Sequence, residues 1–286
     1  MRRILNIPQS RTTSFVIIAV VYLLATAVGV VTYDYCAPKT DALWALFIAD
    51  FAATVFTWAM GLLYRNVSVY DPYWSVLPPV MLSLYALLMD QMTLPAWVML
   101  LSIFVWAIRL TGNWAVTFKG LRHEDWRYTK YRTSLHPVLF HLVNFFGLNM
   151  VPTIVVFLAM TPAFRILEEA PEATLFTWLG AAMSLAAVAI QHLSDTTAHQ
   201  FRREHPGEVC RVGLWKHGRH PNYFGEILMW WGLWVQSLSM PVDWTVVGAI
   251  SNTLLFLCVC IPLMEHRQLK NKPDYAQYRK ETRLFI

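Results

Sequence analysis

The chain has 286 residues, of which 56% are hydrophobic and 14% are charged, and its mean hydropathy is +0.41. A soluble domain of this length carries about 25% charged residues, so the composition excludes an ordinary soluble protein and predicts a polytopic membrane protein. The pI near 9.0 does not indicate a nucleic-acid partner, because the basic residues lie in short segments between apolar runs and not in one patch.

Apolar runs of about 20 residues, the length that crosses a bilayer, divide the chain into eight predicted transmembrane helices. The predicted spans are residues 14–33, 42–64, 74–91, 94–117, 137–161, 174–198, 221–239 and 243–264. The span at 74–91 is the weakest, because Pro78 and Pro79 interrupt it. The first run lacks a small-residue cleavage site and is therefore predicted as a retained span, not as a signal peptide.

Lys and Arg are distributed unevenly about these spans. With the N-terminus inside, all of them fall in cytoplasmic segments except Lys39, Arg109 and Arg165. This asymmetry follows the positive-inside rule, favours an even number of spans and predicts that both termini are cytoplasmic. We expect a multi-pass protein of a bacterial inner membrane or the endoplasmic reticulum, with its active site facing the cytoplasm.

The fold class predicted is an all-α transmembrane bundle in three segments. Residues 1–41 form an additional N-terminal helix and loop, residues 42–264 form the bundle, and residues 265–286 form a cytoplasmic tail. Tyr275 and Tyr278 in the tail are three apart, which indicates a short surface helix.

Most polar groups in or beside the spans fall toward the predicted cytoplasmic side. They are Asp71, Arg109, Asn113, His141, Asn144, Gln191, His192, Asp195, Asn222, Glu226, Glu265 and His266. Because a charge in hydrocarbon costs about 2.5–3.5 kcal/mol, this clustering predicts a polar cavity open to the cytoplasm. Hydrogen bonding between helices is the alternative for Gln191 and His192, and Arg109 has Asp71 or Asp195 as alternative structural partners. Asp50, in the outer half of its span, is interpreted as structural.

Residues 213–226 carry the densest pattern of basic and polar groups. Pro221 is suited to the first turn of a helix, and the positive helix end beside Arg219 and His220 predicts an anion site. Anchoring to lipid phosphates is the alternative. Asn222 and Glu226 are four apart and share a helix face.

A second pattern lies upstream, where Gln191, Asp195 and Arg202 form one row if the helix continues into the cytoplasm. An amide and a carboxylate suit sugar hydroxyls or a carboxamide, and an arginine suits phosphate, so the row would accommodate an anionic dinucleotide. No glycine-rich nucleotide motif occurs. The histidines have no Cys or carboxylate at a ligand spacing, and no metal site is predicted.

Several motifs together resemble those of membrane steroid 5α-reductases and their uncharacterised bacterial relatives, over roughly residues 45–286. They are Gly213-Leu214-Trp215, Arg219-His220-Pro221-Asn222-Tyr223-Phe224-Gly225-Glu226, Ser194-Asp195 with Arg202, Asp274-Tyr275, Tyr70-Asp71-Pro72-Tyr73-Trp74-Ser75, and Glu124-Asp125-Trp126-Arg127-Tyr128. Isoprenylcysteine methyltransferases, which use S-adenosylmethionine, carry a run similar to the second motif.

The resemblance implies that NADPH is the cofactor. It implies contacts with NADPH from Asp195, Arg202 and Asn222, with Gln191 at a position where the reductases have Asn. We assign five further residues to the cofactor site: Arg109, Arg219, His220, Glu226 and Tyr275.

The resemblance also implies that Asp71 meets the carbonyl of the substrate. The reductases place a Tyr beside this acid, but the matching position here is Trp106, so Tyr73 or a water molecule is the expected substitute. The predicted catalytic residues are therefore Asp71 and Tyr73.

The function expected is NADPH-dependent reduction of an activated C=C bond in a lipid, such as a steroid or isoprenoid enone. The alternative is a methyltransferase that acts on a prenylated or phospholipid substrate, and a third hypothesis is a non-enzymatic lipid-binding protein. The expected partners are a lipid-like small molecule and the bilayer, with no obligate protein partner inferred.

Overall fold

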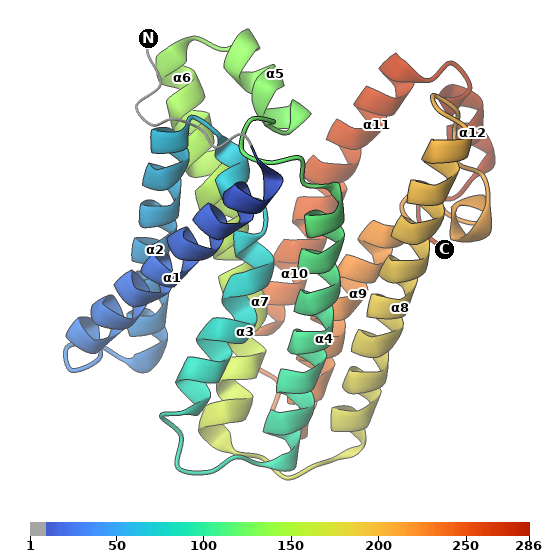
Figure 1. Cartoon of the computed structure of the whole chain (residues 1–286). Helices are drawn as coiled ribbons and strands as arrows, with labels where there is room; N and C mark the ends of the chain where they lie inside the picture. The colour runs from blue at the N-terminus through green and yellow to red at the C-terminus, as the bar shows by residue number, and fades with distance from the viewer. Residues whose placement is uncertain (1–9) are drawn as a thin grey trace. The chain divides into compact units, whose positions relative to one another are not determined.

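The computed structural model describes residues 10–286 and is helical along most of that range (Figure 1). The helices of the first half are α1 (Arg11–Cys36), α2 (Ala42–Tyr64), η1 (Val67–Val69), α3 (Tyr73–Ala86), α4 (Leu94–Thr117), α5 (Trp126–Ser134) and α6 (Pro137–Leu142). Those of the second half are η2 (Val143–Met150), α7 (Val151–Glu169), α8 (Leu175–Glu204), η3 (Gly213–Lys216), α9 (Pro221–Gln236), η4 (Ser237–Ser239), α10 (Val246–Leu255), η5 (Phe256–Cys260), α11 (Ile261–Asn271) and α12 (Tyr275–Glu281). No β-strand occurs in the described range, which confirms the all-α class.

Six continuous helices within residues 10–286 are long and apolar enough to cross a membrane. They are Arg11–Cys36, Ala42–Tyr64, Leu94–Thr117, Pro137–Glu169, Leu175–Glu204 and Val246–Asn271. The predicted spans at 74–91 and 221–239 are also helical, but α3 has 14 residues and α9 has 16, fewer than the roughly 20 that cross a bilayer core. The last long helix continues through Glu265, so the predicted tail begins inside a helix.

The predicted orientation rests partly on Arg2 and Arg3, which lie outside the described residues. The cytoplasmic placement of both termini therefore stays a prediction.

The chain forms two compact units, each made of two segments. The first unit is Met1–Pro78 with Leu110–Phe157, and the second is Pro79–Arg109 with Leu158–Ile286. The predicted segments are consecutive stretches of the chain, divided at residues 41 and 264. These two boundaries stay a prediction.

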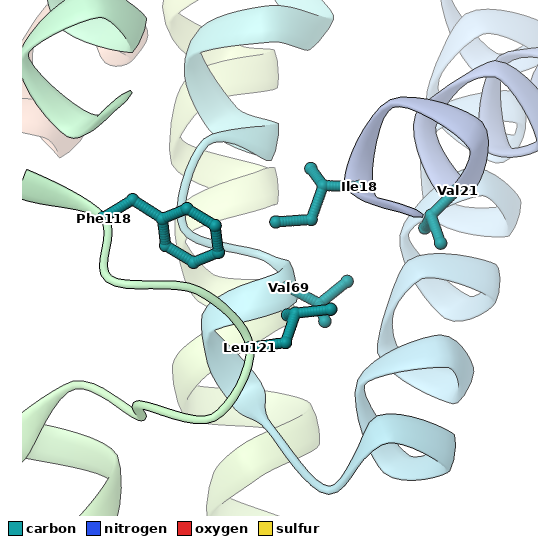
Figure 2. Packing of buried hydrophobic residues seen from close by; sticks show 5 residues of the cluster. All are labelled: Ile18, Val21, Val69, Phe118 and Leu121. Atoms are coloured by element: carbon teal, nitrogen blue, oxygen red, sulfur yellow. The ribbon is translucent and has the colours of Figure 1, made fainter. Parts of the chain in front are cut away.

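In the first unit, α1 packs on α2 and on the segments that follow α2 and α4. Figure 2 shows the apolar cluster that joins them, in which Ile18 and Val21 of α1 face Val69, Phe118 and Leu121. All five side chains are at most 8% exposed. This packing fixes the polar segment that begins after α2, which carries Asp71.

In the second unit, glycines bring α8 and α9 into close contact. A Cβ on Gly180 would lie 2.4 Å from the carbonyl oxygen of Gly232, and a Cβ on Gly225 would lie 2.6 Å from Cγ of Gln191. Small residues at such positions let two helix backbones approach closely. The close approach sets Gln191 beside the first turns of α9.

Gly180→Ala is expected to destabilise the protein by about 1–3 kcal/mol, because the added methyl group collides with backbone atoms of α9. Gly112→Ala is the matched control: Gly112 is also helical, but its Cβ would meet nothing within 4 Å, so Ala should stabilise by up to about 1 kcal/mol. Thermal unfolding in detergent measures both. Equal unfolding midpoints for the two variants would contradict this account of the helix contact.

Candidate functional site

Glu226 is the centre of a buried polar cluster in the second unit. It lies one turn inside α9 and is 4% exposed. Its Oε2 accepts hydrogen bonds from Trp106 Nε1 at 3.0 Å and Gln191 Nε2 at 2.7 Å, and its Oε1 accepts one from Trp230 Nε1 at 2.9 Å. One carboxylate thus joins α4, α8 and α9, and its acceptor capacity is largely used inside the protein.

Arg109 and Asp195 extend this cluster toward the protein surface. Arg109 donates to Gln191 Oε1 at 3.1 Å, to the Gln191 carbonyl at 2.8 Å and to the Asp195 carboxylate. Asn222 Nδ2 donates to Asp195 Oδ1 at 3.3 Å. The structural partner of Arg109 is therefore Asp195. Five of the residues predicted for the cofactor site meet here, and we call them the Glu226 cluster: Arg109, Gln191, Asp195, Asn222 and Glu226.

Arg202 lies on the same helix as two members of this cluster. Because α8 runs without a break to Glu204, Gln191, Asp195 and Arg202 do belong to one continuous helix. Gln191 is buried, Asp195 is partly exposed and Arg202 is exposed. Polar side chains are thus available from the interior of the second unit to its surface along a single helix.

Arg219 and His220 belong to a different cluster, centred on Glu265. Arg219 Nε lies 2.9 Å and His220 Nε2 lies 3.3 Å from Glu265 Oε1, while Arg279 Nε lies 3.0 Å from Oε2. Arg219 also donates to the Thr282 carbonyl at 2.5 Å. The anion expected at the start of α9 is therefore provided by the chain itself. Burial lowers the pKa of His220, although Glu265 acts in the opposite direction.

The C-terminal segment packs against this cluster. The backbone N–H groups of Arg219 and His220 donate to the carbonyls of Arg283 and Leu284, beside a parallel bridge between Gly218 and Arg283. Tyr275, the remaining predicted cofactor residue, is 4% exposed, and burial raises its pKa to about 12. Its phenol is protonated at neutral pH.

In the first unit, Asp71 is paired with Tyr128. Tyr128 Oη donates to Asp71 Oδ1 at 2.5 Å, and Arg127 Nη2 lies 4.0 Å from the same oxygen. Burial raises the pKa of Asp71 to about 6, although the Arg127 charge and the Tyr128 hydrogen bond act to lower it. Asp71 therefore exchanges a proton close to neutrality, which suits a general acid or hydrogen-bond donor.

Tyr73, the predicted partner of Asp71, has a different contact. Its hydroxyl is buried and donates to Asp50 Oδ1 at 3.4 Å. The phenol beside Asp71 is instead that of Tyr128, which the sequence analysis did not select. The signal was present, because Tyr128 ends the Glu124–Tyr128 motif and Asp71 belongs to the other motif of the bacterial relatives.

Hydrogen bonds tie these two motifs together. Asn66 Nδ2 donates to the carbonyls of Leu121 and His123 at 2.8 and 3.0 Å. The Val67 N–H donates to Glu124 Oε1 at 3.0 Å. A polar segment that follows α2 is thus fixed against the loop that follows α4, so Asp71 and Tyr128 are held in place before any ligand binds.

Residues 57–282 match the family model described as a protein of unknown function, DUF1295. The chain belongs to the DUF1295 family. This is a membrane family, which agrees with the six long apolar helices. No curated protein matches the chain, and no solved structure matches it.

The DUF1295 match contains every residue that we assigned to the candidate site. Asp71, Arg109 and Tyr128 lie in its first part, and the other residues of the Glu226 and Glu265 clusters lie in its last part. The match begins within α2, so α1 precedes it. The polar centres of this DUF1295 protein therefore belong to the family region and not to the N-terminal addition.

Asp71→Asn is expected to flatten the dependence of stability on pH. The carboxyl pKa is about 3.9 in an unfolded chain and about 6 in the folded protein. Because the folded pKa is higher, the stability present below pH about 4 is lost as the pH rises through 6, by at most about 3 kcal/mol. Unfolding curves in detergent from pH 4 to pH 8 measure the loss. Parallel curves for wild type and variant would contradict it.

Proposed function

We propose that this protein is an NADPH-dependent reductase of an activated C=C bond in a membrane lipid, such as a steroid or isoprenoid enone. The observation that carries the proposal is the preformed pair of Asp71 and Tyr128. A carboxyl group whose pKa is about 6 is protonated in part of the molecules at neutral pH. It can then donate a hydrogen bond to a substrate carbonyl oxygen.

The Glu226 cluster supports NADPH as the cofactor. Asp195 and Asn222 are only partly buried and present a carboxylate and an amide, which suit the hydroxyls of a ribose or a carboxamide. Arg202, further along α8, suits a phosphate. These donors and acceptors fit a dinucleotide.

The other predicted cofactor residues fit a positioning role better than direct contact. Glu226 accepts hydrogen bonds from Gln191 and from two tryptophans, and Arg109 donates to both Gln191 and Asp195. Arg219 and His220 are engaged by Glu265, so we propose that they and the buried Tyr275 hold the start of α9 in place.

The proposed reaction needs one hydride and one proton. NADPH, when bound, supplies the hydride to the β-carbon of the enone. The π electrons then move toward the carbonyl oxygen, where Asp71 donates a hydrogen bond supported by Tyr128. A preorganised donor at such an oxygen lowers the barrier by about 3–4 kcal/mol. A proton added at the α-carbon completes the saturated ketone, and we expect these steps to face the cytoplasm.

The decisive experiment is nucleotide-dependent stabilisation of the detergent-solubilised protein. A ligand that binds only the folded state adds about 2.7 kcal/mol at 100 times its Kd, so NADPH should raise the unfolding midpoint clearly. A rise with S-adenosylmethionine but not with NADPH would replace the reductase by the methyltransferase. A rise with neither would remove both and favour the non-enzymatic lipid-binding hypothesis.

A further inference from the structure

Two cations from distant parts of the second unit lie in segments that meet near the end of α8. Arg202 lies in the last turn of α8, and Lys272 follows the last residue of α11. Lys272 Nζ donates to the carbonyl of Glu208 at 2.6 Å. Because Glu208 lies only six residues after Arg202, this contact fixes the ammonium group beside the end of α8.

The surrounding segments are fixed by further contacts. Arg211 Nη1 lies 2.7 Å from Glu281 Oε2, and Tyr278 Oη donates to the carbonyl of Trp215 at 2.5 Å. These contacts hold α12 against the segment between α8 and α9, near the C-terminus in Figure 1. The contact with Glu208 therefore fixes Lys272, and Arg202 is exposed in the last turn of α8.

The surroundings of Lys272 disfavour the charged form of its ammonium group. Burial lowers the pKa of Lys272, and the positive charges of Arg202 and Arg267 lower it further. Several carboxylates of this region have other partners: Glu281 pairs with Arg211, Glu204 accepts from Gln200, and Glu208 lies 3.7 Å from His205. An exposed guanidinium and a partly buried ammonium group in one region favour the binding of an anion.

We propose that Arg202 and Lys272 bind a phosphate group. A guanidinium group offers a planar pair of donors and an ammonium group offers a compact charge, a combination that suits phosphate oxygens. The phosphate belongs to a nucleotide or to a lipid headgroup. The nucleotide source rests on the proposed function, whereas the phosphate chemistry stands independently of it.

The test uses inorganic pyrophosphate with the full-length protein in detergent at constant ionic strength. Pyrophosphate should raise the unfolding midpoint of the wild type more than sulfate does. In Arg202→Gln and in Lys272→Gln, its apparent affinity should fall at least tenfold. The matched controls Arg203→Gln and Lys270→Gln remove exposed cations nearby and should keep the wild-type response.

Two results would overturn the proposal: a wild type that shows no response beyond that of sulfate, or variants at 202 and 272 that respond like the wild type. Lys272→Arg keeps the charge and should recover most of the response, which separates lost binding from lost folding. Midpoints measured without anion report the folding of each variant.

The source of the phosphate is distinguished in the same assay. If NADP+ stabilises the wild type more than NAD+ does, and if this difference is lost in Arg202→Gln or Lys272→Gln, the phosphate belongs to the nucleotide. If short-chain phosphatidate stabilises the protein and neither nucleotide does, the result supports the phosphate site and contradicts the reductase proposal. If NADPH stabilises the wild type and both variants equally, the result supports the reductase proposal and contradicts the phosphate site.

Discussion

Asp71→Asn is expected to reduce turnover about 100- to 1000-fold and to leave the Kd of NADPH within about twofold. Asn has the shape of Asp and still accepts the hydrogen bond from Tyr128, but its amide N–H is a far weaker acid than a carboxyl O–H, so the developing oxyanion loses most of its stabilisation. Removal of one oxyanion donor raises the barrier by about 3–4 kcal/mol, which sets the scale of the loss. The measurement is kcat for NADPH oxidation with a panel of steroid and isoprenoid enones, together with nucleotide binding.

Two comparisons sharpen this result. Arg202→Ala should show the reverse pattern, with weaker NADPH binding and kcat reduced only a few-fold, because a phosphate is a part of the cofactor that does not react. Wild-type turnover should also decline as the pH rises above about 6, where Asp71 loses its proton. Full turnover of Asp71→Asn with the responsive enone would remove Asp71 from the reaction.

Glu226→Ala is expected to destabilise the protein by about 3–5 kcal/mol. The change leaves the N–H donors of Trp106, Gln191 and Trp230 without their acceptor in a buried position. Each orphaned donor costs about 1–3 kcal/mol, although such costs do not add fully. Thermal or denaturant unfolding in detergent measures the loss.

The controls for this change are Glu226→Gln and Glu204→Ala. Gln keeps one acceptor oxygen and should lose less stability than Ala. Glu204 is an exposed carboxylate whose Oε1 accepts from Gln200 at 3.1 Å, so its removal should change stability by less than about 0.5 kcal/mol. If Glu226→Ala were as stable as Glu204→Ala, Glu226 would not be the residue that joins α4, α8 and α9.

Apolar length and proline positions were enough to predict the long apolar helices, but not the short polar helix α5. The predicted spans 42–64 and 94–117 have the same bounds as α2 and α4, and α9 begins at Pro221 as its ring requires. The lengths of the spans were harder to predict, because hydropathy alone does not show where a helix stops. For example, the helix predicted over residues 74–91 ends at Ala86 as α3.

Partners on different helices could not be predicted uniquely: for Arg109 the sequence left Asp71 and Asp195 as alternatives, and the structure gives Asp195. Helix periodicity placed Gln191, Asp195 and Arg202 on one helix, and the continuity of α8 confirms that placement. Asp71 and Tyr128 are 57 residues apart, and the segments that carry them are joined by hydrogen bonds to Asn66 and Glu124. No local pattern carries that information.

The start of α9 shows the same difference between what the sequence determines and what the tertiary structure determines. The sequence by itself determined that cations at a positive helix end, Arg219 and His220, require an anion. Only the tertiary structure decided that this anion is Glu265, 46 residues from Arg219. The physical reason is that the need of a charge for a partner is a property of the group and its helix, whereas the identity of the partner depends on which distant segments the helices bring together.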